Sequence, residues 1–317
     1  MEKNQAKKLV SLVVPFYNEG TTVFDLFREL LPLIDSASQY DFEIICIDDG
    51  SNDDTINNLL SIGDKRIKII QLSRNFRKEA ALTAGLNFAR GDAVIPIDAD
   101  LQDPPRLILE MLKKWEEGFD VVLAKRIDRS TDDTLKKFSA HAFYKINNWL
   151  TDFKLPENVG DFRLMDHVVV EAIKRLPERQ RFMKGLFAWV GFKTTVVKFK
   201  REPRISGVTK WNKWKLWNFA IEGITSFSTG LLRIWSYIGM FFALIALFYG
   251  GYIILRVWLH GIDVPGYASM FSALLFFGGV QLIGIGTLGE YIGRIYQESK
   301  QRPIYIVKKI YDSKETH

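Results

Sequence analysis

Two long apolar runs near the C-terminus restrict the possible folds of this 317-residue chain more than any other feature. Residues 234–255 and 268–289 each continue for about 22 residues without a charge, the length of a helix that crosses a bilayer. A pair of buried core helices is the alternative, although uncharged runs much above about 18 residues are uncommon in soluble cores. The sequence therefore predicts two transmembrane helices.

The distribution of basic residues predicts how these helices are oriented. Lysines and arginines gather before the first run and after the second, whereas the loop between them offers only Arg256 and His260. By the positive-inside rule, both termini face the cytoplasm of a multi-pass protein in the cell membrane. The net charge of +6 could suggest nucleic acid, but these basic residues lie beside apolar runs, so a lipid bilayer is the better partner.

The N-terminal part also has the properties of a cytoplasmic domain. The apolar stretch 9–16 is too short for a signal peptide and is broken by Pro15. The single cysteine, Cys46, excludes an intrachain disulfide and lies in an apolar run, which predicts a buried structural thiol.

Apolar strand-like runs alternate with segments of helical period over the first 125 residues. This pattern predicts an α/β fold in which helices cover a mostly parallel sheet. The expected strands are 9–14, 42–47, 67–72, 93–97 and 121–124, and the expected helices are 23–34, 53–60 and 79–89.

Polar residues follow three of these strands, at 15–19, 48–51 and 98–105. Ligands bind beyond the carboxyl ends of the strands in such sheets, so these segments are expected to meet at one crevice. The carboxylates of Asp98 and Asp100 follow the strand two residues apart and suit Mg²⁺ or Mn²⁺, which can also bind a nucleotide diphosphate. The alternatives are a solvated acidic turn at 98–100 and a plain turn with a helix cap at 48–53.

The motifs resemble those of family 2 inverting glycosyltransferases, which have the GT-A (Rossmann-like) nucleotide-sugar-binding fold. The resemblance rests on residues 13–19, 47–51, 73–76 and 98–105. Residues 160–166 and 204–211, with the paired apolar runs, extend it to dolichyl-phosphate mannose synthases and, most closely, to bacterial polyprenyl-phosphate (bactoprenol) glucosyltransferases. It implies inverting transfer of a hexose, glucose from UDP-glucose, to undecaprenyl phosphate.

The resemblance also implies roles for individual residues. The residues that it implies for nucleoside binding are Pro15, Tyr17, Glu19, Ile47 and Asp49. Asp98 and Ala99 would line the donor site, and Asp100 and Gln102, beside Asp98, would bind the metal. Arg204 and Lys210 would bind the donor diphosphate. The family usually has Ser-Lys-Tyr where this chain has Thr209-Lys210-Trp211, so the hydroxyl and aromatic character are retained.

The acceptor phosphate is already anionic, so its repulsion from the donor diphosphate is a larger problem than its activation. Arg126, directly after a strand, is the first candidate to neutralise it, with Lys136 or Lys137 as partners; the alternative for the lysines is a solvated helix face. Asp161 resembles the carboxylate proposed to act as base or to orient the acceptor. Its alternative role is to hold Arg163 or to start a helix.

Four regions follow from this reading. They are a GT-A domain at 1–200, a donor-site loop with interfacial amphipathic helices at 201–230, a transmembrane hairpin at 231–293 and a basic tail at 294–317. Trp211, Trp214 and Trp217 alternate with lysines as in segments that lie in a bilayer interface, with aromatic core packing as the alternative. Glycines in the apolar runs permit close helix packing, and the resemblance implies a homotetramer.

Three other functions remain to be distinguished. A processive polysaccharide synthase needs more spans and usually a Gln-x-x-Arg-Trp motif, which is missing at the nearest string, 178–182. A mannosyltransferase would use GDP-mannose, and a non-catalytic membrane scaffold would have no need to keep Asp98, Asp100 and Gln102. The four histidines have no metal-ligand spacing, so no zinc site is expected.

Overall fold

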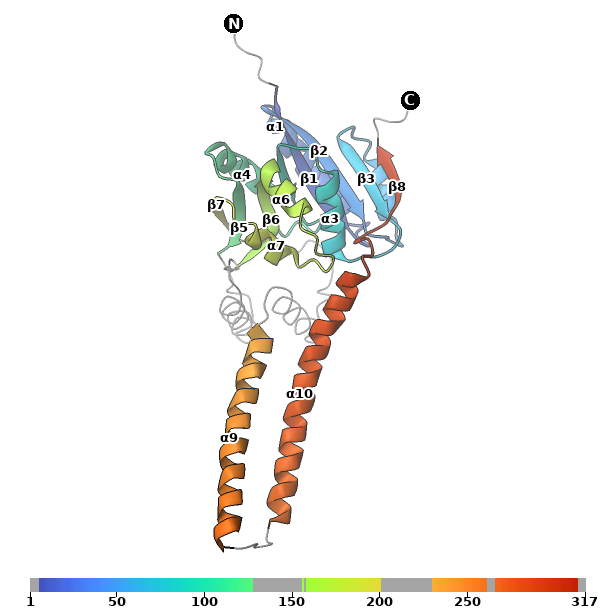
Figure 1. Cartoon of the computed structure of the whole chain (residues 1–317). Coiled ribbons are helices and arrows are strands. Elements are labelled where there is room, and N and C mark those ends of the chain that lie inside the picture. The colour runs from blue at the N-terminus through green and yellow to red at the C-terminus, as the bar shows by residue number, and fades with distance from the viewer. Residues whose placement is uncertain (1–5, 128–155, 157, 201–229, 261–265, 313–317) are drawn as a thin grey trace.

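A computed structural model describes residues 6–127, 156, 158–200, 230–260 and 266–312. It consists of an α/β domain and two long helices that extend away from one edge of the domain (Figure 1). The α/β fold class predicted from the sequence is confirmed.

The described residues form one sheet of eight strands in the order β7-β5-β6-β4-β1-β2-β3-β8. The strands are β1 Lys8–Phe16, β2 Tyr40–Asp48, β3 Ile67–Leu72, β4 Ala93–Pro96, β5 Val121–Arg126, β6 Val159–Asp166, β7 Thr194–Phe199 and β8 Val307–Asp312. Strands β1 to β4 are parallel, and β5 is parallel to β7. Strand β6 is antiparallel to β4 and β5, and β8 is antiparallel to β3, so the sheet is mixed.

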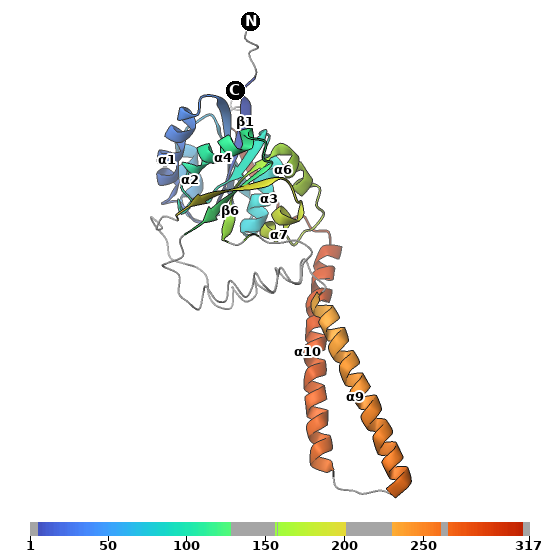
Figure 2. The same cartoon turned by 90° about the vertical axis from the view of Figure 1, so that its left-hand side faces the viewer.

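Helices cover both faces of the sheet (Figure 2). They are α1 Val23–Ser36, α2 Thr55–Ser61 and α4 Leu107–Glu116 on one face, and α3 Lys78–Phe88, α6 His167–Lys174 and α7 Met183–Trp189 on the other. Successive side chains of a strand point to opposite faces, so Val14 packs in the first core cluster and Val13 in the second. Cys46 is fully buried in the first cluster, as expected of a structural thiol.

Helix α3 packs against the sheet more closely than a side chain at every position would allow. A Cβ added to Gly85 would lie 2.1 Å from Val13 Cγ1. Glycine costs a helix interior about 1 kcal/mol relative to alanine, and here it permits this close approach. The packing fixes the direction in which α3 begins, at Lys78.

Strand β8 differs from the sequence prediction, which gives residues 294–317 only as a basic tail. It pairs with β3, and Lys68 Nζ lies 2.9 Å from Asp312 Oδ2. Lys308 and Lys309 interrupt the apolar pattern by which a strand is recognised in the sequence, and charged side chains of this kind are common on edge strands. The chain therefore returns to the sheet after its last helix.

The two apolar runs form helices α9, Gly230–His260, and α10, Tyr267–Ser299. Both are long and apolar enough to cross a membrane, and none of their most apolar segments is buried. The alternative of two buried core helices is therefore wrong. The helices contact each other through Trp235, whose Nε1 donates to Thr287 Oγ1 at 3.1 Å and whose ring packs on Gly284.

The hairpin joins the domain at the edge where the parallel strands end (Figure 1). The segment between α10 and β8 reaches this edge directly, since Ser73 N, just past the end of β3, donates to Ile306 O at 2.9 Å. The polar strand ends predicted from the sequence therefore face the side from which α9 and α10 project.

Candidate active site

Strands β1 and β2 end side by side. Tyr17, just after β1, is 37% exposed, whereas Asp49, just after β2, is 3% exposed. Asp49 N donates to Phe16 O at 2.8 Å, and Asp49 Oδ1 accepts from Phe76 N at 2.6 Å. Burial raises the pKa of Asp49 to about 6 despite the backbone amides that stabilise its charge.

The turn after β2 packs directly on the segment that follows β3. Gly50 has φ +71°, and a Cβ there would lie 2.5 Å from the carbonyl carbon of Arg74. Asp48 accepts from Ser51 N at 3.2 Å, so the residues after β2 form the turn that was the alternative for this motif. The helix cap expected at 48–53 is wrong, because α2 begins at Thr55 after Asp54, which makes no side-chain cap hydrogen bond. Only glycine meets both the left-handed backbone and the close contact.

The loop after β4 carries the predicted metal ligands. Ala99 is buried, while Asp98 and Asp100 on either side are partly exposed. Gln102 N donates to Asp100 Oδ1 at 3.2 Å, and Gln102 Oε1 is buried without a hydrogen-bond partner among the described residues. A buried oxygen of this kind beside a carboxylate fits a hard divalent cation.

Three non-glycine residues in these loops have a left-handed backbone: Asn18 at φ 51°, Arg77 at φ 75° and Leu101 at φ 54°. Each follows the end of a different strand, β1, β3 or β4. Such conformations cost of order 1 kcal/mol or more and gather at ligand sites. The strain marks the same edge of the sheet that the polar motifs predicted.

Lys78 connects the donor-side motif with Asp161, and the sequence analysis missed it. Its Nζ lies 2.7 Å from Asp98 Oδ1 and 2.7 Å from Asp161 Oδ2. A lysine in the first turn of a helix opposes the helix dipole and is unfavourable without an acidic partner. That mismatch at the start of α3 is the signal that could have identified it.

Asp161 reaches the site because β6 is antiparallel to its neighbours, so β6 begins where they end. The alternative that Asp161 starts a helix is wrong, and its ion pair is with Lys78 rather than Arg163. Burial opposes ionisation, but the charges of Lys78, Lys184 and Arg163 outweigh it and lower the pKa of Asp161 to about 2. Asp161 is an anion at neutral pH.

Glu79 is a second carboxyl group that the sequence analysis did not single out. Its Oε2 accepts from Met183 N at 3.2 Å. Burial, and then the charge of Asp161, raise the pKa of Glu79 to about 8, so it is largely protonated at neutral pH. Arg163 lies close by, 4.1 Å above the Phe187 ring, and burial lowers its pKa to about 10.

Arg126 ends β5 at the same edge. Its backbone N donates to Asn158 O at 3.0 Å, which places it beside the start of β6 and close in the strand pairing to Asp161. Four other predicted site residues, Lys136, Lys137, Arg204 and Lys210, lie outside the described residues, as does the tryptophan-rich segment.

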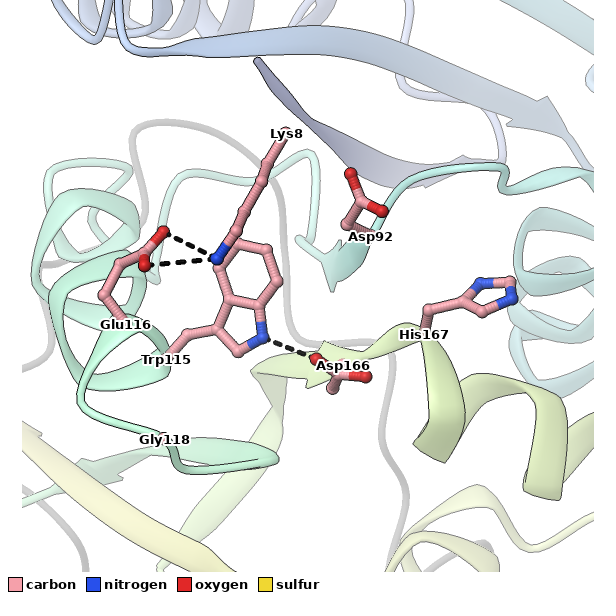
Figure 3. Close-up of a pocket in the computed structure, with 7 residues that line it drawn as sticks. All are labelled: Lys8, Asp92, Trp115, Glu116, Gly118, Asp166 and His167. Atoms are coloured by element: carbon pink, nitrogen blue, oxygen red, sulfur yellow. Dashed lines mark hydrogen bonds and ion pairs between the residues drawn. The ribbon is translucent and has the colours of Figure 1, made fainter. Parts of the chain in front are cut away.

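A hollow of about 430 Å³ lies at the opposite edge of the sheet, where the parallel strands begin (Figure 3). Several of the side chains that line it contact one another. Lys8 Nζ lies 3.1 Å from Glu116 Oε1 and 4.4 Å from the centre of the Trp115 ring, and Trp115 Nε1 donates to Asp166 Oδ2 at 2.7 Å. These contacts join α4 to the sheet and contain none of the predicted site residues.

Comparison with known proteins agrees with this architecture. The profile of glycosyl transferase family 2 matches residues 11–174, and that of the GtrB C-terminal hairpin matches residues 232–295. The bactoprenol glucosyl transferase of Shigella phage SfV is 53% identical over 301 residues, 94% of this chain and 98% of the phage protein. The prophage bactoprenol glucosyl transferase homolog of Escherichia coli K12 is 52% identical over 303 residues, 95% of this chain and 99% of that protein.

A solved structure shares the fold at much lower identity. Mannosyl-3-phosphoglycerate synthase from Rubrobacter xylanophilus superposes with a TM-score of 0.50 at 19% identity, over 74% of this chain and 75% of that one. The predicted GT-A fold is therefore confirmed. The chain belongs to glycosyl transferase family 2 and carries a GtrB-type C-terminal hairpin.

Proposed function

We propose that this protein transfers a glucosyl group from a nucleotide-sugar to a polyprenyl phosphate at the membrane surface. One observation carries the proposal: Lys78 joins the donor-side Asp98 to Asp161 at the edge of the sheet that faces two apolar helices. Relatives that share more than half of their residues with this chain, over nearly its whole length, are named bactoprenol glucosyl transferases. A lipid acceptor and a soluble donor would meet at this edge.

On the donor side, Asp49 would hold the nucleoside of UDP-glucose in the turn after β2. Asp100 and Gln102 would hold Mg²⁺ or Mn²⁺ together with two oxygens of the donor diphosphate. The described residues contain no cluster of three or more His, Cys, Asp or Glu that could hold a metal, so the donor itself would complete the coordination. When bound, the metal would neutralise the leaving diphosphate.

On the acceptor side, Arg126 would bind the phosphate of undecaprenyl phosphate. Asp161, held as an anion by Lys78, would accept a hydrogen bond from the remaining hydroxyl of the phosphate monoanion and so orient it. A phosphate oxygen would then bond to the anomeric carbon as the bond from that carbon to the diphosphate breaks on the opposite face. The products would be a β-linked polyprenyl-phosphate glucose and a nucleoside diphosphate.

The topology we propose follows from β8. Strands β1 and β8 belong to one sheet, so the chain before α9 and the chain after α10 lie on one side of any membrane that the hairpin crosses. Two crossings satisfy this requirement. The flanking basic residues favour the cytoplasmic side for the domain and for both termini.

We also propose that the protein forms a homotetramer through its hairpin. Gly284 packs on Trp235, but a Cβ at Gly278, Gly279 or Gly286 would meet nothing within 4 Å in the described part of the chain. These positions leave room for helices of other copies. Cross-linking of the protein in native membranes should yield species up to four chains, and a monomer alone would contradict the proposal.

The transfer is tested with the full chain in nanodiscs, undecaprenyl phosphate and radiolabelled UDP-glucose, followed by lipid extraction. Label should enter the lipid only with Mg²⁺ or Mn²⁺ present, and Asp100→Ala should lower the rate at least about 100-fold. Asp25→Ala, which alters an exposed ion pair with Arg28 on α1, is the control. Full turnover of Asp100→Ala in EDTA would exclude the metal site.

Parallel reactions with GDP-mannose separate the remaining functions. Lipid labelling from GDP-mannose alone would identify a mannosyltransferase. The absence of any metal-dependent binding of UDP- or GDP-sugars, measured by calorimetry, would instead support a membrane scaffold.

A further inference from the structure

The end of α10 that reaches the domain carries a stripe of charge. Glu290, Arg294 and Glu298 are the first charged residues after the apolar run and are spaced four apart, so they share one face of the helix. Arg294 Nη2 lies 2.9 Å from Glu290 Oε1, and Arg294 Nη1 donates to Gln180 Oε1 at 3.3 Å. The stripe therefore faces residues 177–182, which we call the docking loop.

Glu298 makes the closest contact with the docking loop. Its Oε1 accepts from Arg179 N at 3.0 Å and from Gln180 N at 2.9 Å, and its Oε2 lies 3.1 Å from Arg179 N. Hydrogen bonds to a carboxylate are about twice as strong as those between neutral groups. Arg181 braces the loop from within, because its buried guanidinium donates to Leu176 O at 2.8 Å and Glu178 O at 3.1 Å.

The docking loop leads directly into the candidate active site. It ends at Phe182, and both Phe182 and Met183 are buried. Met183 N donates to Glu79 Oε2, and Glu79 adjoins Lys78, which bridges the two site carboxylates. Hydrogen bonds and the backbone of the docking loop thus connect the last turn of α10 with the residues predicted to bind the acceptor.

The chain beyond α10 is attached to the domain as well. Tyr305 OH accepts from Asn87 Nδ2 at 3.0 Å on α3, and Ile306 O accepts from Ser73 N at 2.9 Å. The helix has 33 residues, a length of about 50 Å, against about 30 Å for the hydrocarbon core of a bilayer. The charged end of α10 can therefore lie outside the hydrocarbon core, where this end of the helix contacts the domain.

We propose that Glu298 is a positioning residue whose carboxylate locks α10 to the docking loop and so holds the acceptor side of the site at a set height and angle to the bilayer. The lock itself is independent of the function proposed above. Its effect on transfer rests on that function.

Hydrogen exchange on the full chain in nanodiscs tests the lock. In Glu298→Ala, the amides of Arg179 and Gln180 should exchange about tenfold faster than in the wild type, because they lose their acceptor. Glu298→Gln keeps an acceptor oxygen and should retain most of the protection. Glu171→Ala, which removes an ion pair with Lys174 within α6, should leave these amides unchanged. Unchanged exchange in Glu298→Ala would overturn the proposal.

Transfer assays test the positioning. In Glu298→Ala, kcat with undecaprenyl phosphate in a bilayer should fall about tenfold, while transfer to a short, water-soluble prenyl phosphate and the KM for the donor stay near wild type. An equal loss with both acceptors, or no loss with either, would refute the positioning role. If the wild type labelled no lipid at all, the proposed function would fail, and the exchange experiment would still decide whether the lock exists.

Discussion

Replacing Glu79 with glutamine should make the stability of the protein less dependent on pH. The wild-type carboxyl group has its pKa raised from 4.5 to about 8, first by burial and then by the charge of Asp161. The glutamine side chain would still present an oxygen to Met183 N, so the substitution removes the titration while it keeps the hydrogen bond.

The sign follows from proton binding in the two states. Below about pH 4.5 the carboxyl is protonated in both states, and well above pH 8 it is ionised in both. Between these values the native state holds a proton that the unfolded state has lost, so wild-type stability falls as the pH rises. The ceiling is about 5 kcal/mol at 1.36 kcal/mol per pKa unit, and the part between pH 6 and pH 8 is about 2 kcal/mol.

The assay is thermal unfolding of the full chain in detergent at one scan rate, followed by tryptophan fluorescence from pH 6 to pH 8.5. A change of about 1 kcal/mol in stability changes the Tm of a large domain by roughly 2 °C. The Tm of Glu79→Gln should therefore rise by about 4 °C relative to the Tm of the wild type as the pH increases over this range. Glu171→Gln is the matched control, since a hydrogen bond from Lys174 lowers the pKa of Glu171 and keeps it away from this window. Parallel pH curves for Glu79→Gln and wild type would show that Glu79 does not titrate as the structure implies.

Three further substitutions test the site. Lys78→Met leaves Asp161 buried without its ion pair and should lower kcat/KM for lipid glucosylation about 100-fold, and Lys78→Arg should recover part of the rate. Wild-type activity in Lys78→Met would contradict a joint role for Asp98 and Asp161. Gly50→Ala forces a Cβ to 2.5 Å from the Arg74 carbonyl carbon and should destabilise the protein by about 1–3 kcal/mol, measured by chemical denaturation. Arg126→Ala should raise the KM for the lipid phosphate about tenfold with little change in the KM for the donor, as measured by titrating each substrate in turn. A raised KM for the donor with an unchanged KM for the lipid phosphate would contradict this role.

The fold class and most of the strands could be predicted from the sequence. The predicted strand 67–72 coincides with β3, and the predicted strands 9–14, 42–47 and 121–124 lie inside the longer β1, β2 and β5. Buried strands of a parallel sheet are continuous apolar runs, so the pattern carries the information locally. The uncharged length of α9 and α10 is a local signal of the same kind.

The site was only partly predictable. Asp98, Asp100 and Gln102 stand together in the sequence, and Asp49 follows its own strand, so each is marked by its immediate neighbours. Lys78 carries no such mark. Its partners are 20 and 83 residues away, and only the packing of α3 against the sheet brings its ammonium group between them.

The amino-acid sequence by itself determined the apolar strands, the turns that follow them and the two membrane-length helices, because periodicity and composition act over a few residues. The tertiary structure alone decided that β6 runs antiparallel, which puts Asp161 at the edge where β4 delivers Asp98. It also decided that β8 closes the sheet beside β3 and that Glu298 contacts the docking loop 119 residues away. Strand direction and long-range contacts depend on how distant segments share one core, and no local pattern encodes that.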